Sequence, residues 1–562
     1  RLYYNFYHVD TDRYRLADGY HQVMVGTREL SPQLPAKART WVNERLQFTH
    51  GYGIVMNFVS KTAGGGVPQY TLDNIPARSA FGLNLTRPEI YYGKSMRGYR
   101  IVATKVKEFD YPKGNHNVYA HYTGTGGIPL DSLWKKMLFA WTQSDLNILL
   151  TSSLGPESRI QIWRRVRERV AKVAPFLRFD QDPYPVLSNG RLYWIADAYT
   201  VSDHFPYSNP WRQSRQQTRM PPGFGINPVG RMIQQQSTGA DPAAGLSGGL
   251  NYIRNSVKAV VDMYNGTVRF YVMDPSDPVL AVYRRAFPQA FSDLAKLPDD
   301  LKRHLRYPEG LFTIQAEQYR FFHMTDPRVF YNQEDLWQFP VETYEDETHF
   351  MRPYYVLMKL PGSTRLEYLL MTPFTPSGRG NMIAWMAAKC DFPDYGKMVV
   401  FKLPKERTIY GPNQVDAMIS QNTDISRQLS LWDQRGSHVI RGKQIVTPIE
   451  NAFLYVVPIY LTATGLSFPQ LKRVIVAADG KVTMAPTLQA SLAEMFKPQQ
   501  SATGSPQAAR TAGERGNGPG QSRLDLAKQT FEQARKALQQ GNWEEFGKAM
   551  GTLDHQFSGP SH

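Results

Sequence analysis

Three turn dipeptides, each set between runs of alternating apolar residues, constrain the fold more than any other feature of the chain. Asn189-Gly190 lies in YPVLSNGRLYWIADAYT, Asn265-Gly266 in VVDMYNGTVRFYVMD, and Asp479-Gly480 in LKRVIVAADGKVTMAPT. Such pairs accept a positive φ at both central positions of a tight turn, and the alternation gives each strand one buried face. Each stretch therefore predicts an antiparallel β-hairpin.

Helical patterns lie between the hairpins. In SRIQIWRRVRERVAKVA the apolar residues Trp163, Val166, Val170 and Val173 recur at 3-4-3 spacing, which predicts a helix with these four side chains in the core. The same kind of argument predicts the other helices, which are 128–141, one starting at 297–300, 308–323, 413–433 and one ending near 390. Hairpins mixed with helices, without βαβ regularity, predict an α+β fold.

Two polar segments divide the chain. Residues 208–249 are rich in Gly, Pro and Gln and predict a long mobile loop within an α+β body, residues 1–495, that has two or more subdomains. Residues 496–521 have the composition of a disordered linker. Residues 522–556 hold a capping box and two apolar repeats joined by a Gly-Asn turn, which predicts a C-terminal helical hairpin.

Charge and cysteine content limit the function classes. The net charge of +16 would attract nucleic acid, anionic lipid or an acidic wall polymer. The basic residues form no tract of the nucleic-acid type, so we expect no nucleic-acid partner. A single cysteine excludes an internal disulfide framework. No apolar run approaches the roughly 18 residues that cross a bilayer, so we expect the body to be soluble.

The sequence contains no catalytic motif that we can identify. Zinc-protease, dithiol and P-loop patterns are absent, which favours a function other than catalysis. The alternative is an envelope hydrolase or transferase acting on glycans or lipids, and it requires Asp180, Asp182 or Asp391 to converge in one cleft. Closely spaced acidic pairs could also hold Ca²⁺, although Asp beside Pro is common turn chemistry. These pairs are Asp10/Asp12, Asp180/Asp182, Asp274/Asp277 and Asp391/Asp394.

Two groups of residues are candidate ligand contacts. A Gly/Arg turn placed before a predicted helix would suit an anion, and the alternative is a structural turn with a helix cap. The residues of this candidate loop are Thr375, Ser377, Gly378, Arg379, Gly380 and Asn381. The basic face of the predicted helix 158–174 could contact an anionic surface, or could be solvated and paired with Glu168. Its residues are Arg164, Arg165, Arg167 and Lys172.

Many stretches between residues 1 and 495 resemble uncharacterised protein family 0182, a bacterial family of multi-pass membrane proteins. Among them are RYRLADGYHQVMVGTREL, GPESRIQIWRRVRERVAKVAPFLRFDQDPY, LNYIRNSVKAVVDMYNGTVRFYVMDPSDP and LMTPFTPSGRGNMIAWMAAKCD. The resemblance implies that transmembrane helices come first and that a large extracytoplasmic domain follows, and this chain is similar to that second part. The resemblance carries over no catalytic residues and implies no cofactor.

From the resemblance we expect the chain to lie at the cell membrane, on the extracellular or periplasmic side. Its partner would be its own upstream transmembrane region, with anionic lipid or a wall polymer as candidate ligands and oligomerisation left open. The aromatic-rich opening RLYYNFYHVD leads us to expect a protein that continues upstream. The expected function is binding, assembly or scaffolding at the cell envelope.

Overall fold

The computed structural model divides into two units, which are described separately. Unit 1 is Arg1–Met358 with Leu366–Met495, and unit 2 is Lys359–Arg365 with Phe496–His562. The structure describes residues 4–31, 34–211, 243–246, 248–344, 347–404, 406–434, 436–449, 452–463, 469–497, 529–537, 542, 545–550 and 552. Within these ranges, no helix combines the length and the apolar character needed to cross a membrane.

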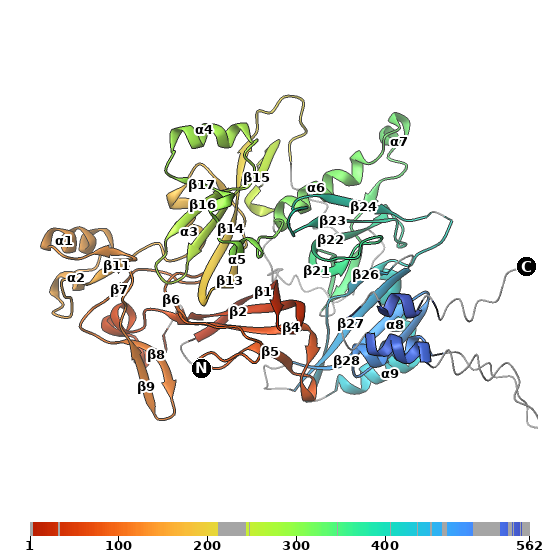
Figure 1. Ribbon diagram of the computed structural model, residues 1–562, viewed down its shortest axis with the longest axis horizontal. Helices are drawn as coiled ribbons and strands as arrows, with labels where there is room; N and C mark the ends of the chain where they lie inside the picture. The colour runs from red at the N-terminus through yellow and green to blue at the C-terminus, as the bar shows by residue number, and fades with distance from the viewer. Residues whose placement is uncertain are drawn as a thin grey trace, which may run out of the picture. The chain divides into compact units, whose positions relative to one another are not determined.

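The first sheet of unit 1 is antiparallel and has the order β1-β2-β4-β5 (Figure 1). Its strands are β1 (Tyr4–Leu16), β2 (Gly19–Leu30), β4 (Ile54–Thr62) and β5 (Pro68–Leu72). Alternate residues such as Val23, Val25 and Ile54 are fully buried, as the period-2 pattern of a half-buried strand requires.

A smaller region follows, built from short strands and the helices α1 and α2. Its elements are η1 (Ala36–Ala38), η2 (Asn43–Gln47), β3 (Gly51–Tyr52), η3 (Gly64–Gly66), β6 (Glu89–Ile90), β7 (Arg100–Val102), β8 (Glu108–Lys113), β9 (His116–Ala120), β10 (Ile128–Pro129), α1 (Leu133–Thr142), α2 (Asn147–Leu150) and β11 (Arg159–Gln161). β10, β11 and β7 form a three-stranded sheet, and α1 and α2 cover its core.

The central sheet has the order β12-β14-β15-β16-β17, with β13 paired to β14. One face shares a core with the first sheet and with α3, and the other face packs on α5. The elements are α3 (Val166–Val173), β12 (Arg178–Phe179), β13 (Tyr184–Ser188), β14 (Arg191–Ser202), η5 (Ala244–Leu246), β15 (Tyr252–Asp262), β16 (Val268–Val272), α4 (Pro278–Ala286), β17 (Phe291–Asp293), η6 (Leu294–Lys296) and α5 (Asp299–Lys302).

Two further antiparallel sheets complete unit 1. One has the order β18-β22-β23-β24 and packs on α6, and the other has the order β25-β27-β28-β29 and packs on α10. The elements are α6 (Glu309–Phe322), α7 (Pro327–Asn332), β18 (Trp337–Gln338), β19 (Val341–Tyr344), β20 (Glu347–Phe350), β21 (Tyr354–Lys359), β22 (Leu366–Pro376), β23 (Ala384–Lys389), β24 (Met398–Lys402), α8 (Pro412–Gln421), α9 (Thr423–Trp432), β25 (Ser437–Arg441), β26 (Ile445–Ile449), β27 (Ala452–Ala463), β28 (Gln470–Ala478), β29 (Lys481–Ala485) and α10 (Leu488–Met495).

All three predicted hairpins are present. Asn189-Gly190 joins β13 to β14 with φ values of 47° and 75°, and Asp479-Gly480 joins β28 to β29 with 45° and 78°, as a two-residue type I′ turn requires. The Asn265-Gly266 loop between β15 and β16 is longer, and only Gly266 has a positive φ. The mixture of antiparallel hairpins and helices confirms the α+β class.

The helix predicted over 158–174 was wrong in its first half. Residues 159–161 form the strand β11, and the helix α3 begins only at Val166. Trp163 has a φ of 47°, which ends any right-handed helix, and its side chain is 46% exposed instead of buried. Val173, the last residue of the predicted apolar stripe, is also exposed, at 54%. The backbone around Arg164 is hydrogen-bonded to Gly93 instead, so tertiary pairing overrides the helical pattern.

Three other helix predictions needed correction. The helix predicted to end near Cys390 is the buried strand β23, because a continuous apolar run suits a central strand as well as a helix. The helix predicted over 128–141 begins at Leu133, where Ser132 supplies the N-cap. The helix predicted over 413–433 is two helices, because Asn422 ends α8 and its side chain caps α9.

The predicted mobile loop and the predicted linker fall mainly outside the described residues. At the edges of the loop, Trp211, Ala243 and Leu246 are buried in the core that α6 shares with β22. In unit 2, residues 529–537 and 545–550 are helical, on either side of the predicted Gly-Asn turn.

Candidate functional site

The predicted ligand loop is a β-turn between two strands and does not precede a helix. Thr375 lies in β22 and is buried, and the chain turns at Gly378, which has a φ of 73°. Ser377 donates its backbone N–H to the carbonyl of Leu336, and Gly380 lies against Gln414 at the start of α8. Since no helix begins here, the backbone N–H groups expected to bind an anion are not assembled, and the predicted cap at Asn381 is also absent.

Of the four residues on the predicted basic face, one is buried, one is half-buried and two are exposed. Arg164 is 2% exposed and donates to the carbonyls of Tyr91 and Thr49, so it cannot contact an external surface. Arg165 is half-buried and donates to the carbonyl of Lys94. Arg167 and Lys172 are exposed on α3.

The acidic pair Asp10/Asp12 belongs to a buried network of ion pairs. Asp10 accepts from Arg306 at 3.0 Å and from Lys94 at 3.2 Å, and Asp12 contacts His304 at 2.7 Å. These contacts join β1 to the segment before α6, so the charges are used in structure. In the part of the chain that the structure describes, no group of three or more His, Cys, Asp or Glu side chains is placed to hold a metal ion.

The carboxylates that a hydrolase would need are bound by different partners. Tyr199 donates to Asp180, Lys94 donates to Asp182, and Asp391 accepts from Arg13, Tyr20 and the backbone N–H of Tyr368. The Asp274/Asp277 pair includes a helix cap, since Asp277 accepts from the backbone of α4. Asp180 and Asp182 lie close together, since the backbone N–H of Asp182 donates to Asp180, while Asp391 is held by other partners.

Two carboxyl groups near this network titrate at unusually high pH. Burial, reinforced by the carboxylates of Asp180 and Asp182, raises the pKa of Glu309 to about 7. Burial and the nearby Asp197 raise the pKa of Asp180 to about 6. Such shifts accompany catalytic sites and structural ion networks alike. Neither residue lines the pocket described next.

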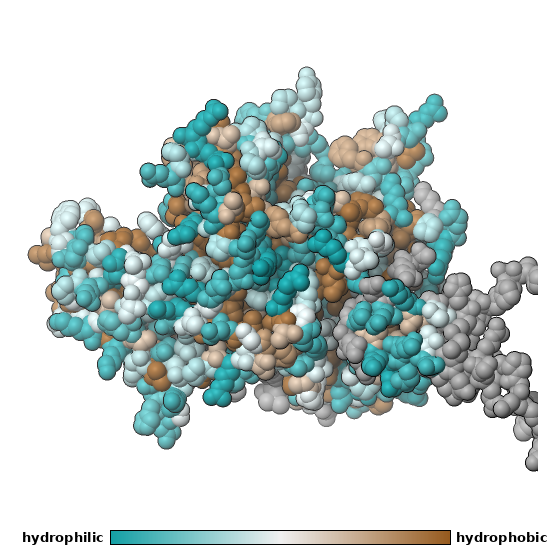
Figure 2. Space-filling model, viewed as in Figure 1, coloured by the Kyte–Doolittle hydropathy of each residue, from teal (hydrophilic) through white to brown (hydrophobic). Residues whose placement is uncertain are grey.

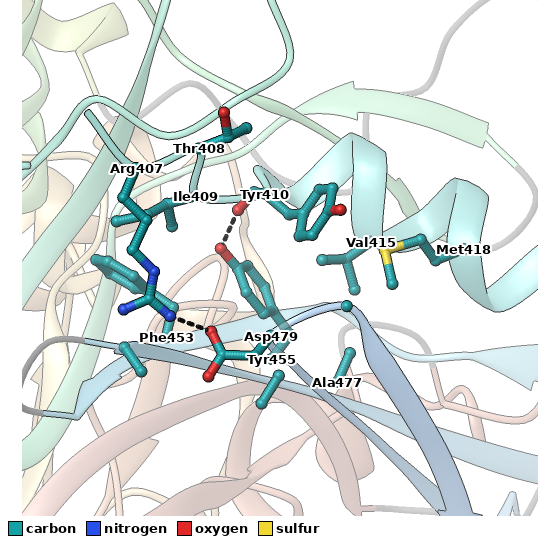
Figure 3. Close-up of a pocket in the computed structure, with 13 residues that line it drawn as sticks. Arg407, Thr408, Ile409, Tyr410, Val415, Met418, Phe453, Tyr455, Ala477 and Asp479 are labelled. Atoms are coloured by element: carbon teal, nitrogen blue, oxygen red, sulfur yellow. Dashed lines mark hydrogen bonds and ion pairs between the residues drawn. The ribbon is translucent and has the colours of Figure 1, made fainter. Parts of the chain in front are cut away.

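A pocket of about 220 Å³ lies between α8 and the strands β27 and β28 (Figure 3). Its walls are mixed in polarity and include Ile409, Phe453 and Tyr455. Among the lining residues the one carboxylate, Asp479, is paired with Arg407 at 2.7 Å. The pocket therefore lacks the second acid or base that hydrolysis of a glycoside needs.

The most unusual surface of unit 1 covers the helices α1 and α2. Large apolar side chains are exposed here, including Trp134 at 68% exposure and Trp141 at 81%. Figure 2 shows hydrophobic (brown) atoms among hydrophilic ones in the region where Figure 1 draws α1 and α2. We call this set the α1–α2 surface, and its residues are Leu133, Trp134, Met137, Leu138, Trp141, Leu146, Leu149 and Leu150. Exposed large apolar side chains grouped on two neighbouring helices mark an interaction site far more often than a scattered exposed leucine does.

The helices beneath this surface are held firmly. Phe139 and Ile148 point into a core of their own with β7 and β11. Asp145, in the loop between α1 and α2, accepts from Trp41 at 2.8 Å and from the hydroxyl of Tyr99 at 2.5 Å. Burial disfavours the charge, but these donated hydrogen bonds outweigh it and lower the pKa of Asp145. The exposed residues are therefore presented on an ordered support.

Cationic side chains lie beside the same support. Arg45 stacks over the ring of Tyr99 at 4.3 Å, and both Arg45 and Arg100 donate to the Tyr99 carbonyl, at 3.2 and 2.9 Å. Neither guanidinium forms an ion pair with a carboxylate of the described residues. Arg97 is exposed nearby, and Lys105 donates to the carbonyl of Ser152, just after α2. Arg100 is buried, whereas Arg97 and Lys105 are exposed and Arg45 is half-buried, so these three can reach an external anion.

The sequence reasoning predicted the helix but missed its exposed face. The signal was present in LWKKMLFAW, because every residue of this stretch except Lys135 and Lys136 is apolar, so the apolar residues are not confined to one narrow stripe. A short helix of this kind can bury only one side in a small core, so the opposite side must stay exposed or bind a partner.

Comparisons with known proteins agree on one family. The family described as Uncharacterised protein family (UPF0182) matches residues 1–432. The chain is 43% identical to a UPF0182 protein of Desulforamulus reducens, with 98% of this chain and 57% of the relative covered. It is 46% identical to a UPF0182 protein of Cupriavidus necator, with 98% and 57% covered.

A relative from a third organism gives a similar match. A UPF0182 protein of Methanospirillum hungatei is 43% identical, with 98% of this chain and 58% of the relative covered. The chain thus spans a little more than half the length of these curated relatives. No solved structure matches it at a significant level. On these matches, the chain belongs to UPF0182, an uncharacterised protein family.

Proposed function

We propose that this chain is the extracytoplasmic domain of a longer membrane protein, with a binding, assembly or scaffold role at the cell envelope. Its partner would be the transmembrane part of the same protein, and it could also form oligomers. The relatives support this proposal because they are longer, the chain covering 57% of two of them. The net charge of +16 favours anionic lipid or wall polymer as ligands, with Arg167 and Lys172 as further surface contacts.

The observation that carries a binding role is the α1–α2 surface. Burying an aliphatic or aromatic side chain is favourable by roughly 1.5–3 kcal/mol, so each apolar residue left in water forgoes stabilisation that a partner could supply. Trp141, Trp134 and Leu150 expose 81%, 68% and 79% of their surfaces. A surface of this composition on an ordered support is typical of a docking site.

The location can be tested with a membrane-impermeant maleimide on intact cells that express the full gene. Asn115 lies at the exposed tip of the β8–β9 hairpin, and Asn115→Cys would place one accessible thiol there. The natural Cys390 is buried, so the unsubstituted protein serves as the control. We expect labelling of Asn115→Cys before lysis. Labelling only after the membrane is opened would contradict the extracytoplasmic location.

The binding role can be tested with a photo-crosslinking residue placed at position 141. A second variant with the same residue at Tyr331, which is 88% exposed on α7, provides the matched control. We expect position 141 to give crosslinked products in native membranes that position 331 does not give. Equal, background-level crosslinking at both positions would count against a docking role for α1 and α2.

A further inference from the structure

We propose that the α1–α2 surface lies in the headgroup region of an anionic lipid bilayer. This inference rests on the proposed envelope location and names the partner of the docking surface. A bilayer offers two kinds of contact at once. Its hydrocarbon boundary accepts tryptophan and leucine side chains, and its phosphate groups bind guanidinium and ammonium groups.

The apolar contacts have the composition that a bilayer interface favours. Tryptophan has an apolar ring and one N–H donor, and it gathers where hydrocarbon meets water. Trp134 and Trp141 are one heptad apart on α1, and Leu138 lies between them. Leu146 and Leu150, which are 68% and 79% exposed, extend the same kind of side chain through the loop and α2.

The charges around the surface favour an anionic partner. Residues 91–162 contain nine Lys or Arg and five Asp or Glu, and of the nine cations the side chains of Lys94 and Arg100 are buried and Lys135 is paired with Asp131. Lys136 belongs to α1 itself, Arg45 stacks on Tyr99, and Arg97 is exposed two residues before Tyr99 in the chain. Among the described residues, neither arginine forms an ion pair with a carboxylate. Gly98, with a φ of 66°, leaves room for Arg45, since a Cβ there would be 3.1 Å from its Nη1 atom. The Arg45 guanidinium, held in this way, suits contact with a phosphate group.

The same charges disfavour a second copy of the chain as the occupant. A two-fold interface built on this surface would bring two equally basic regions together, and like charges across an interface oppose association. The phosphate layer of an anionic membrane has the opposite sign. The apolar residues alone fit either occupant, so the charge decides between them.

The test is vesicle co-sedimentation of the whole chain. We would use phosphatidylcholine vesicles with or without about one-third phosphatidylglycerol, at about 0.1 M and about 0.5 M NaCl. We expect binding that requires phosphatidylglycerol and weakens at higher salt. The double variant Trp134→Ser/Trp141→Ser should bind about 100-fold more weakly, since partial burial of one aromatic side chain is worth about tenfold. The control Tyr207→Ser/Tyr331→Ser, at residues 110% and 88% exposed, should bind normally.

One double variant of the charges completes the design. Arg45→Gln/Arg97→Gln should remove most of the preference for phosphatidylglycerol while the affinity for neutral vesicles changes little. Absence of vesicle binding would overturn the proposal, and so would equal binding by the Trp134→Ser/Trp141→Ser variant. A dimer of the natural chain that this variant turns into a monomer would assign the surface to a second copy instead. Maleimide labelling of Asn115→Cys does not depend on vesicle binding. A negative vesicle result would therefore leave the proposed extracytoplasmic location to be tested by that labelling.

Discussion

Replacement of Glu309 by glutamine is predicted to make the stability of unit 1 less dependent on pH. Glu309 starts α6, and its carboxyl group lies near Asp180 and Asp182. Burial and these neighbours raise its pKa from 4.5 to about 7. Between these two values the unfolded chain has lost the proton and the folded chain keeps it. The natural protein therefore loses stability as pH rises through this window, and the loss is complete above about pH 7.

The magnitude follows from the size of the pKa difference. At about 1.4 kcal/mol per pKa unit, the rise corresponds to roughly 3 kcal/mol. Glu309 is only partly buried and lies in the first turn of a helix, where the helix dipole favours its charge, so we expect about 2 kcal/mol. Glu309→Gln removes this cost, because the amide does not ionise.

The assay is urea unfolding of the natural chain and of Glu309→Gln at about pH 5 and about pH 8. We expect the variant to gain about 2 kcal/mol relative to the natural chain between the two pH values. The exposed residue Glu157 provides the control, and Glu157→Gln should change the difference by less than about 0.5 kcal/mol. A stability difference between Glu309→Gln and the natural chain that is the same at both pH values would refute the reasoning.

Three further outcomes are expected. Arg164→Met should destabilise unit 1 by about 3 kcal/mol in urea unfolding, because two buried carbonyls lose their donor, while the exposed Arg167→Met should have little effect. Gly190→Ala should cost about 2 kcal/mol, because φ is 75° and the added Cβ would stand 2.6 Å from Thr86 Oγ1; an unchanged melting temperature would contradict this. Burial raises the pKa of Cys390 to about 11, so a thiol reagent should react only after unfolding, and rapid native labelling would show that the site is open.

The parts of the fold that the sequence predicted are those set by local chemistry. Asn189-Gly190 and Asp479-Gly480 specify a turn whatever surrounds them, and the apolar alternation of their strands agrees with it. The helical pattern around Trp163 failed because a non-local contact decided it. Arg164 is drawn inward by the carbonyls of Tyr91 and Thr49, which are remote in sequence. Local patterns cannot reveal such a requirement.

The candidate site was harder to predict than the fold. The loop with Ser377 and Arg379 looked like an anion site only because a helix was expected after it, and a strand follows. Trp134 and Trp141 are exposed because the core beneath α1 is small and is filled by other side chains of the helix, such as Phe139. The size of that core depends on contacts between segments that are distant in the chain. The grouping of Arg45 with Tyr99, far apart in the chain, likewise needed the structure.

The most direct measurement of the central claim is the depth of one labelled position in a membrane. Leu146 is 68% exposed between α1 and α2, and Leu146→Cys with a nitroxide label can be compared with Asn115→Cys, while Cys390 stays buried. On phosphatidylglycerol-containing vesicles we predict that the label at 146 is accessible to oxygen and shielded from a water-soluble nickel chelate, while the label at 115 meets the chelate freely. Equal access of the chelate to both positions would contradict the claim that the α1–α2 surface enters the bilayer interface.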